Sequence, residues 1–260
     1  MVRENHDRFE FTVSLAGFPM RVICRHEENR AFLEDYLTDR APLFTVEPTV
    51  ADLEKAHRGF VAAYGIDDGA ETSFSERFLE NNALHALIAE RLATYDTLLF
   101  HGSALCMDGQ AFVFTAPSGT GKSTHARLWR RVFGDRVWMI NDDKPLLRLE
   151  EGGVRVYGSP WDGTPRLSRN ASAPLRAILR LYRSPENRLA PMERADAFQT
   201  LLGQGFASET PDSARHILAL KTRLLDSTAF YSLYCNMEPE AALCAWKGVG
   251  AETCRCRPAD

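Results

Sequence analysis

Hydrophobic and polar residues alternate along two short stretches near the N-terminus, residues 8–15 and 20–25. This period of two is typical of strands with one buried face, and the glycine and proline between the stretches favour a turn. The pattern therefore predicts a β-hairpin. A short helix over 27–36 and an extended segment over 43–50 are expected to follow it.

Residues 73–94 show a helical period instead, because apolar side chains recur there every three or four positions and so share one face. Beyond residue 97, short apolar runs alternate with turn-forming residues. The predicted strands are 98–100, a hairpin over 104–115 that turns at Asp108-Gly109, 137–140, a second hairpin over 146–157, 177–182 and 228–235. The predicted helices are 125–133, 192–202, 213–225 and 238–248, the last of them capped by Gly248.

The change of pattern near residue 95 divides the chain. We expect a smaller α+β part over 1–95, a larger domain over 96–250 and a tail over 251–260. Hairpins lie on both sides of the helix predicted at 125–133, so the larger domain should not have the purely parallel sheet of alternating strands and helices. It is expected to be an α/β domain with a mixed β-sheet.

Composition narrows the class of protein. Apolar residues make up 45% of the 260 residues and charged residues 25%, which is ordinary for a globular protein. The net charge is −4, whereas proteins that bind nucleic acid usually carry an excess of positive charge. No apolar run is long enough to cross a membrane. The first residues are polar and carry acids, so we expect no signal peptide and a cytoplasmic location. Cys106 and Cys235 lie in apolar runs and are expected in the core.

The most specific motif lies between an apolar run at 112–114 and the helix predicted at 125–133. The letters over 116–123, Ala-Pro-Ser-Gly-Thr-Gly-Lys-Ser, follow the phosphate-binding pattern G-x-x-x-x-G-K-[ST]. Glycines let backbone N–H groups face a phosphate, and the helix N-terminus adds its positive dipole end. Lys122 would reach the β- and γ-phosphates and the Ser123 hydroxyl would hold Mg²⁺. The residues expected to hold ATP are Ala116, Pro117, Ser118, Gly119, Thr120, Gly121, Lys122, Ser123 and Thr124.

One position departs from that pattern, because Ala116 stands where the first glycine is usual. Alanine disfavours a positive φ, so the motif is relaxed here rather than absent. An ordinary flexible turn is the alternative reading of the glycines. The strand before the loop, the helix after it and the Lys-Ser pair in register favour the phosphate loop.

Two adjacent carboxylates, Asp142 and Asp143, follow the buried run 137–140 directly. Acids at the end of a buried strand, some way after a phosphate loop, suit a Mg²⁺ site. One acid can hold the metal while the other takes the proton of an attacking hydroxyl. Alone, the pair would be read as an exposed turn. Its place after the phosphate loop favours a site.

Taken together, these residues resemble a known family. The run from His101-Gly102-Ser103-Ala104, through the loop at 116–125, to Asn141-Asp142-Asp143 is similar to the catalytic domain of HPr kinase/phosphorylase. Tyr157-Gly158-Ser159-Pro160-Trp161 fits the short bacterial HPr-kinase-related proteins better than the regulator itself. ATP-dependent phosphoenolpyruvate carboxykinases share the nucleotide-binding fold. The resemblance is close over about 98–182, looser to about 248, and absent over 1–95.

The resemblance implies phosphoryl transfer from ATP, with Mg²⁺, to a hydroxyl. It places His101 in the active site, Asp142 nearer the metal and Asp143 nearer the acceptor. The chain has no clear copy of the family's downstream signature loop, and Trp161-Asp162-Gly163-Thr164 occupies the comparable region. The acceptor and any reverse phosphorolysis are therefore not implied. Asp162 and Arg166 lie in this loop, where substrate contacts concentrate, and are candidate substrate residues.

The sequence thus predicts an ATP-dependent kinase of a P-loop fold that phosphorylates a hydroxyl. The resemblance favours a serine of a peptide or protein as the acceptor. Asp143, His101 and Lys122 would be catalytic, and Ser123 with Asp142 would hold the metal. A small-molecule kinase or carboxykinase-like enzyme remains an alternative. A nucleotide-binding regulatory protein with little catalysis is another. We expect no nucleic-acid or membrane partner, and an oligomer remains open.

Overall fold

The computed structural model describes residues 8–64, 74–163 and 166–253, with residues 63, 64 and 251–253 described by their backbone alone. Contacts between Cα atoms divide the chain into two compact units, residues 1–92 and 93–260. Each unit has its own sheet, and the site residues predicted above all belong to the second unit.

The first unit is an α+β structure. Its described residues form a sheet in which β2 pairs with β1 in antiparallel and with β3 in parallel fashion. The predicted hairpin is confirmed, and it turns at Ala16 and Gly17, both with positive φ. The elements are β1 (Phe9–Leu15), β2 (Phe18–Cys24), α1 (Glu27–Phe32), β3 (Phe44–Val46), α2 (Val50–Tyr64) and α3 (Glu76–Ala93).

A buried carboxylate ties α3 to the end of the hairpin. Glu80 on α3 is only 1% exposed. Its oxygens accept hydrogen bonds from the backbone N–H groups of Arg25 and His26 and from the Asn29 amide, at 2.7, 3.2 and 2.7 Å. A buried carboxylate with this many donors has a structural explanation, so Glu80 needs no functional one.

The second unit is built on a mixed sheet. Its described strands run in the order β4-β8-β9-β10-β6-β5-β7, and β12 pairs with β10 and with β11. The mixed α/β architecture predicted from the sequence is confirmed, since β10 is parallel to β6 and β12 but antiparallel to β9. The strands are β4 (Thr97–Leu99), β5 (Ser103–Met107), β6 (Gln110–Thr115), β7 (Val137–Asn141), β8 (Leu146–Glu150), β9 (Gly153–Tyr157), β10 (Ser172–Arg183), β11 (Arg188–Pro191) and β12 (Phe230–Cys235).

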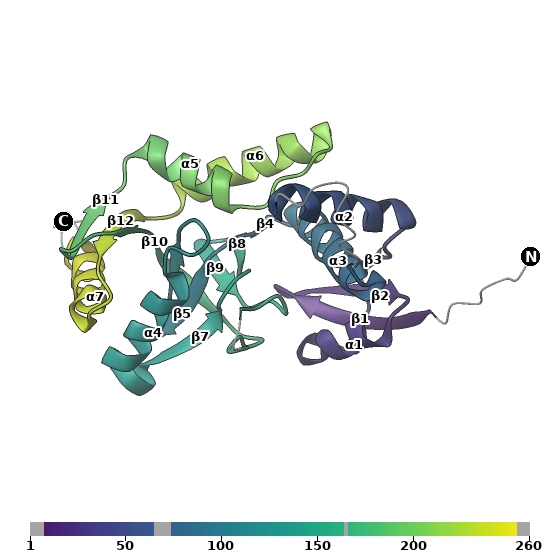
Figure 1. Cartoon of the computed structure of the whole chain (residues 1–260), viewed down its shortest axis with the longest axis horizontal. Coiled ribbons are helices and arrows are strands. Elements are labelled where there is room, and N and C mark those ends of the chain that lie inside the picture. The colour runs from purple at the N-terminus through teal and green to yellow at the C-terminus, as the bar shows by residue number, and fades with distance from the viewer. Residues whose placement is uncertain (1–7, 65–73, 164–165, 254–260) are drawn as a thin grey trace, which may run out of the picture. The chain divides into compact units, whose positions relative to one another are not determined.

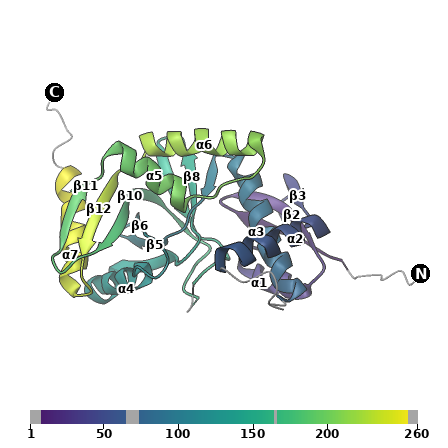
Figure 2. The ribbon, with the colours of Figure 1, turned by 45° about the horizontal axis from the view of Figure 1, so that its top comes forward.

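Helices cover both faces of this sheet (Figure 1, Figure 2). One face packs against α5 (Arg194–Gln204) and α6 (Pro211–Asp226), with Leu201 and Leu220 among the buried contacts. The other face packs against α4 (Lys122–Phe133) and α7 (Pro239–Thr253), with Trp129 fully buried. The sheet is therefore the middle layer of three.

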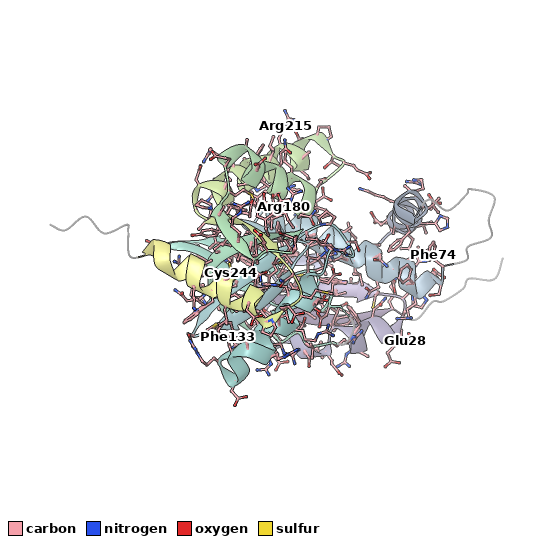
Figure 3. All side chains as sticks on the ribbon, turned by 60° about the vertical axis from the view of Figure 1, so that its left-hand side comes forward. Glu28, Phe74, Phe133, Arg180, Arg215 and Cys244 are labelled. Atoms are coloured by element: carbon pink, nitrogen blue, oxygen red, sulfur yellow. The ribbon has the colours of Figure 1, made fainter. Side chains whose placement is uncertain are left out.

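Labelled side chains mark the two faces (Figure 3). Arg180 projects from β10 toward the α5 side, where its guanidinium donates to the Thr200 hydroxyl at 3.2 Å. Phe133 at the end of α4 packs against Trp246 of α7, with ring centroids 5.6 Å apart. Cys244 lies on the same helix as Trp246. Strand β10 itself contributes to both layers, with Ile178 in the core on the α5 side and Leu179 in the core on the α4 side.

The structure differs from the sequence prediction in three places. Residue 50 begins a helix, α2, that the sequence reading missed, although Thr49 and Asp52 form reciprocal capping hydrogen bonds there. Helix α7 continues past Gly248, so that glycine is not a cap. Strand β11 was also missed. In the described part of the chain no helix is both long and apolar enough to cross a membrane.

Candidate active site

The loop between β6 and α4 has the backbone of an anion cradle. Gly119 and Gly121 have φ of 75° and 122°, a region that side chains with a Cβ rarely adopt. Gly121 precedes the first turn of α4, which carries no acidic residue and no side-chain cap. The N–H groups and the positive dipole end of this helix therefore have no negative partner within the helix.

Ala116 fits without strain. It is fully buried, and it is not among the described residues with positive φ. The glycine that the motif usually has at this position is therefore dispensable in this chain. The departure from the usual pattern has little structural consequence.

Lys122 folds back over the loop that precedes it. Its Nζ donates to the carbonyl of Ala116 at 3.0 Å and lies 3.5 Å from that of Pro117. Burial lowers the pKa of Lys122, while the carboxylates of Asp143 and Asp142 oppose that shift. The ammonium group of Lys122 therefore lies within electrostatic range of both carboxylates. A bound phosphate would have to replace its two neutral carbonyl partners.

Asp142 is a buried carboxylate held by serine hydroxyls. Its side chain accepts a hydrogen bond from Ser103 at 2.5 Å, and the residue is 8% exposed. Burial raises its pKa, and hydrogen bonds from Ser103 and Ser123 act against that rise. The two residues predicted to hold Mg²⁺, Ser123 and Asp142, are therefore near enough for the hydroxyl to lower the pKa of the carboxylate, although they lie in different parts of the chain.

The turn that presents both acids is pinned by Asn141. Its side-chain Oδ1 accepts hydrogen bonds from the backbone N–H groups of Asp143 and Lys144, at 2.9 and 2.6 Å. Its amide donates to the carbonyls of Ser159 and Trp161, at 3.0 and 3.1 Å. This fully used, buried amide fixes the turn after β7 in one conformation.

Asp143 forms a polar triad with His101 and Lys144. One oxygen of Asp143 lies 3.0 Å from His101 Nδ1 and 3.2 Å from Lys144 Nζ, and Nζ lies 2.9 Å from Nδ1. Burial raises the pKa of Asp143, but hydrogen bonds and positive charge from His101 and Lys144 outweigh it and lower the pKa to about 2. Asp143 is therefore an anion at neutral pH.

Backbone contacts place His101 in this triad. Its N–H donates to the carbonyl of Gln204 at 2.7 Å, and the N–H of Gly102 donates to the carbonyl of Asp143 at 3.0 Å. A Cβ on Gly102 would lie 2.8 Å from the carbonyl oxygen of Phe114, so only glycine fits this close approach. The segment after β4 is thereby fixed against both the acid turn and β6.

The two predicted substrate residues have different surroundings. The carboxylate of Asp162 accepts four backbone hydrogen bonds, from Asp142 and Gly163 at 2.8 Å and from Leu167 and Ser168 at 2.7 and 2.8 Å. Arg166 is exposed on the same loop. Asp162 thus organises the loop and anchors the backbone of Asp142, and a substrate contact for either residue stays a prediction.

Three residues of the site were missed by the sequence reading. Ser103 holds Asp142, and Lys144 completes the triad. Arg183, at the end of β10, donates to the carbonyls of Gly119 and Thr120 at 2.5 and 3.3 Å. Lys144 adjoins the acid pair, which was the available signal. Arg183 lies about sixty residues beyond the loop, and only the pairing of β10 with β6 brings it there.

The donor set suits Mg²⁺ bound together with phosphate. Mg²⁺ is usually held by one or two carboxylates, waters and substrate phosphates rather than by an all-protein cage. In the described part of the chain no three His, Cys, Asp or Glu side chains converge as a metal site. Ser123 and Asp142 lie near each other beside the N-terminus of α4. This arrangement fits a Mg²⁺ site that is completed by waters and substrate phosphates.

Comparison with known proteins gives a weak match. No protein-family model and no curated protein matches the chain. Solved structures do match, and one is described as the structure of the Hpr(Ser) kinase/phosphatase from Coxiella burnetii. That match has 10% sequence identity and a TM-score of 0.37, and it covers 60% of this chain and 91% of the other. With so low an identity and TM-score, the match carries no argument, and the activity must be argued from the residues of this chain.

Proposed function

We propose that the protein is an ATP-dependent phosphotransferase that transfers the γ-phosphoryl group to the hydroxyl of a serine in a peptide or protein. One observation carries the proposal. The end of the glycine loop, with Lys122 and Ser123, lies near two acids in the turn after β7, Asp142 and Asp143. Phosphoryl transfer needs this combination of phosphate donors, metal ligand and anionic residue facing an acceptor.

The two acids suit different tasks. Asp142 is buried beside Ser103 and lies near Ser123, so it would hold Mg²⁺ with Ser123, and the metal would neutralise charge on the phosphates. The Asp143 side chain is 35% exposed and lies beside His101, so an acceptor hydroxyl can reach it. This difference in burial supports the division of roles that the family resemblance implies.

Asp143 would orient the acceptor hydroxyl, and it would take the hydroxyl proton late in the phosphoryl-transfer step. A carboxylate with a pKa of about 2 is a weak base. The phosphates of a bound nucleotide add negative charge nearby, which raises that pKa. As the bond between the γ-phosphorus and the bridging oxygen breaks, the acceptor oxygen bonds to phosphorus and its proton passes to Asp143. The products are ADP and a phosphate ester.

Incubation with γ-labelled ATP, Mg²⁺ and a peptide library, followed by mass spectrometry, tests the proposal. Transfer of label to a serine peptide is expected. Lys122→Ala should reduce transfer by roughly 10²–10³-fold, as the loss of one preorganised donor typically does. Lys247→Ala, which removes an exposed lysine on α7, is the matched control and should keep full activity. Tight ATP binding without transfer to any acceptor would favour the regulatory alternative instead.

A further inference from the structure

Helix α4 presents three arginines to solvent. Arg127, Arg130 and Arg131 are all exposed, and the helix contains no aspartate or glutamate. Among the described residues, no carboxylate forms an ion pair with any of the three, whereas the nearby Arg136 is paired with Asp108. We call the three unpaired side chains the arginine face. Its sign is opposite to the net charge of −4 of the whole chain.

The stability of α4 does not account for the arginine face. Arg127 precedes Arg130 by three positions and Arg131 by four, so the three like charges are neighbours on the helix surface. Like charges at this spacing destabilise a helix. Arg130 and Arg131 lie in the last turn and offset the helix dipole, but Arg127 lies a turn earlier and does not. An anionic partner would relieve the repulsion.

The elements beside α4 leave the arginine face positive. Helix α7 packs against α4, and its Glu240 and Lys247 carry opposite charges that cancel. Asp135, in the turn after α4, adds one exposed negative charge, which can offset only one of the three arginines. The surface therefore has an excess of positive charge that the protein itself does not neutralise.

The arginine face begins beside the proposed active site. Ser123 is exposed on the same helix, four residues before Arg127 and seven before Arg130, so the three positions share one face. At 1.5 Å per residue, Arg127 lies about 6 Å and Arg130 about 10 Å along the helix axis from Ser123. Ser123 in turn lies near Asp142. A chain bound at the acids can therefore extend along this helix.

We propose that the arginine face binds acidic side chains of the acceptor peptide or protein, at positions about two to five residues from the phosphorylated serine. The inference rests on the proposed function, because it takes the serine to lie at the acids. Guanidinium groups pair with carboxylates through two parallel hydrogen bonds, which suits this partner. Nucleic acid would also offer anions, but the negative net charge of the chain opposes its approach.

Three peptides of about twelve residues test the arginine face. Each has one central serine, and the flanking positions are all glutamate, all glutamine or all lysine. Fluorescence anisotropy measures their binding without any need for phosphoryl transfer, and γ-labelled ATP measures transfer separately. The glutamate peptide should exceed the glutamine peptide by about tenfold in affinity and in kcat/KM, mostly through KM. About 0.5 M NaCl should reduce this preference to about twofold or less.

The triple variant Arg127→Gln, Arg130→Gln and Arg131→Gln should lose the preference for the glutamate peptide. Glutamine is as good a helix former as arginine, so α4 should remain folded. The matched control removes the same charge from the opposite layer, through Arg194→Gln, Arg215→Gln and Arg223→Gln on α5 and α6. It should keep the preference. Figure 3 shows Arg215 on that layer, away from Phe133 at the end of α4.

Reversing the charge at the three positions provides a rescue. A variant with glutamate at 127, 130 and 131 should bind the lysine peptide about tenfold more tightly than the glutamate peptide, which is the opposite of the wild-type order. A helix that had simply unfolded would not acquire a new preference. Calorimetry with Mg²⁺ and ATP should give affinities within about twofold of each other for wild type and all variants, because the arginines are assigned to the acceptor.

The outcomes separate the two proposals. Equal binding of the three peptides, or equal loss in the control variant, would overturn the arginine face and leave the phosphotransferase proposal standing. A single-stranded oligonucleotide that bound as tightly as the glutamate peptide, and lost affinity in the triple variant, would make this face a nucleic-acid surface instead. If the glutamate peptide binds through the arginines but no peptide receives label, the face binds acidic peptides and the proposed function is wrong.

Discussion

His101 Nδ1 lies 3.0 Å from a carboxylate oxygen of Asp143, and the same nitrogen lies 2.9 Å from Lys144 Nζ. A ring nitrogen that bears a proton donates to Asp143, and one without a proton accepts from Lys144. The triad therefore has two hydrogen-bonding states that differ by the position of one proton. Lys144 Nζ also lies 3.2 Å from each carboxylate oxygen of Asp143.

Asp143→Asn should separate chemistry from nucleotide binding. Asparagine keeps the shape of the side chain but cannot take the acceptor proton, so transfer should fall by about 10²–10⁴-fold. Nucleotide affinity should change little, because Asp142 and Ser123 remain. Calorimetry for affinity and labelled phosphate for transfer check both expectations. If Asp143→Asn lost nucleotide binding while Asp142→Asn kept it, the two acids would have the reverse roles.

Asp142→Asn should stabilise the protein without ligands. The pKa of Asp142 is raised by burial, so its ionised form is disfavoured in the folded state and lowers stability at pH values above that pKa. Removing the charge should therefore raise Tm at pH 7, and the gain should vanish as the pH falls and the wild-type carboxyl protonates. The same variant should lose the Mg²⁺-dependent rise of Tm with ATP. Thermal unfolding from pH 4 to 8 measures both effects, and a lower Tm at pH 7 would contradict the argument.

Asp162→Asn should loosen the loop that follows β9. The amide nitrogen would replace one oxygen that now accepts two backbone hydrogen bonds, which leaves N–H groups facing a donor. The expected cost is about 2 kcal/mol of unfolding free energy. Denaturant unfolding checks it, with Asp226→Asn on the exposed end of α6 as a control. If Asp162 served only to contact substrate, stability would stay the same.

Lys221 should make stability depend on pH in the alkaline range. It is 3% exposed, donates to the carbonyl of Gly205 at 3.1 Å, and burial lowers its pKa to about 8 from 10.5. Between these values the unfolded chain binds more protons than the folded one, so this lysine should raise stability as the pH rises. The Tm of wild type relative to Lys221→Met should therefore increase from pH 8 to 10. A constant difference would show that the folded and unfolded pKa values are equal.

The sequence predicted the parts of the site that depend on local order. The loop at 116–124 and the acids at 142 and 143 are continuous motifs beside predicted strands, so their positions could be inferred without a fold. Asp162 was assigned to substrate because it lies in a loop. Its four backbone partners depend on how that loop folds back on the acid turn, which residue types do not encode.

The position of Cys235 could not be predicted for a different reason. Cys235 was expected in the core because it ends an apolar run, yet it is only partly buried and lines a pocket beside the glycine loop. The parallel pairing of β12 with β10 brings it there, and strand pairing across about fifty residues leaves no local signal. Cys106 was placed correctly, since it lies within a hairpin that the sequence shows directly and is 2% exposed.

The pairing of β10 has a consequence for synthesis of the chain. This strand pairs with residues 111–115 on one side and, from Ile178 to Arg183, with residues 230–235 on the other. While the chain emerges from the ribosome, β10 can join β6 long before β12 exists. Until residue 235 has been made, one edge of β10 presents unpaired backbone groups, which is a template for association with other nascent chains.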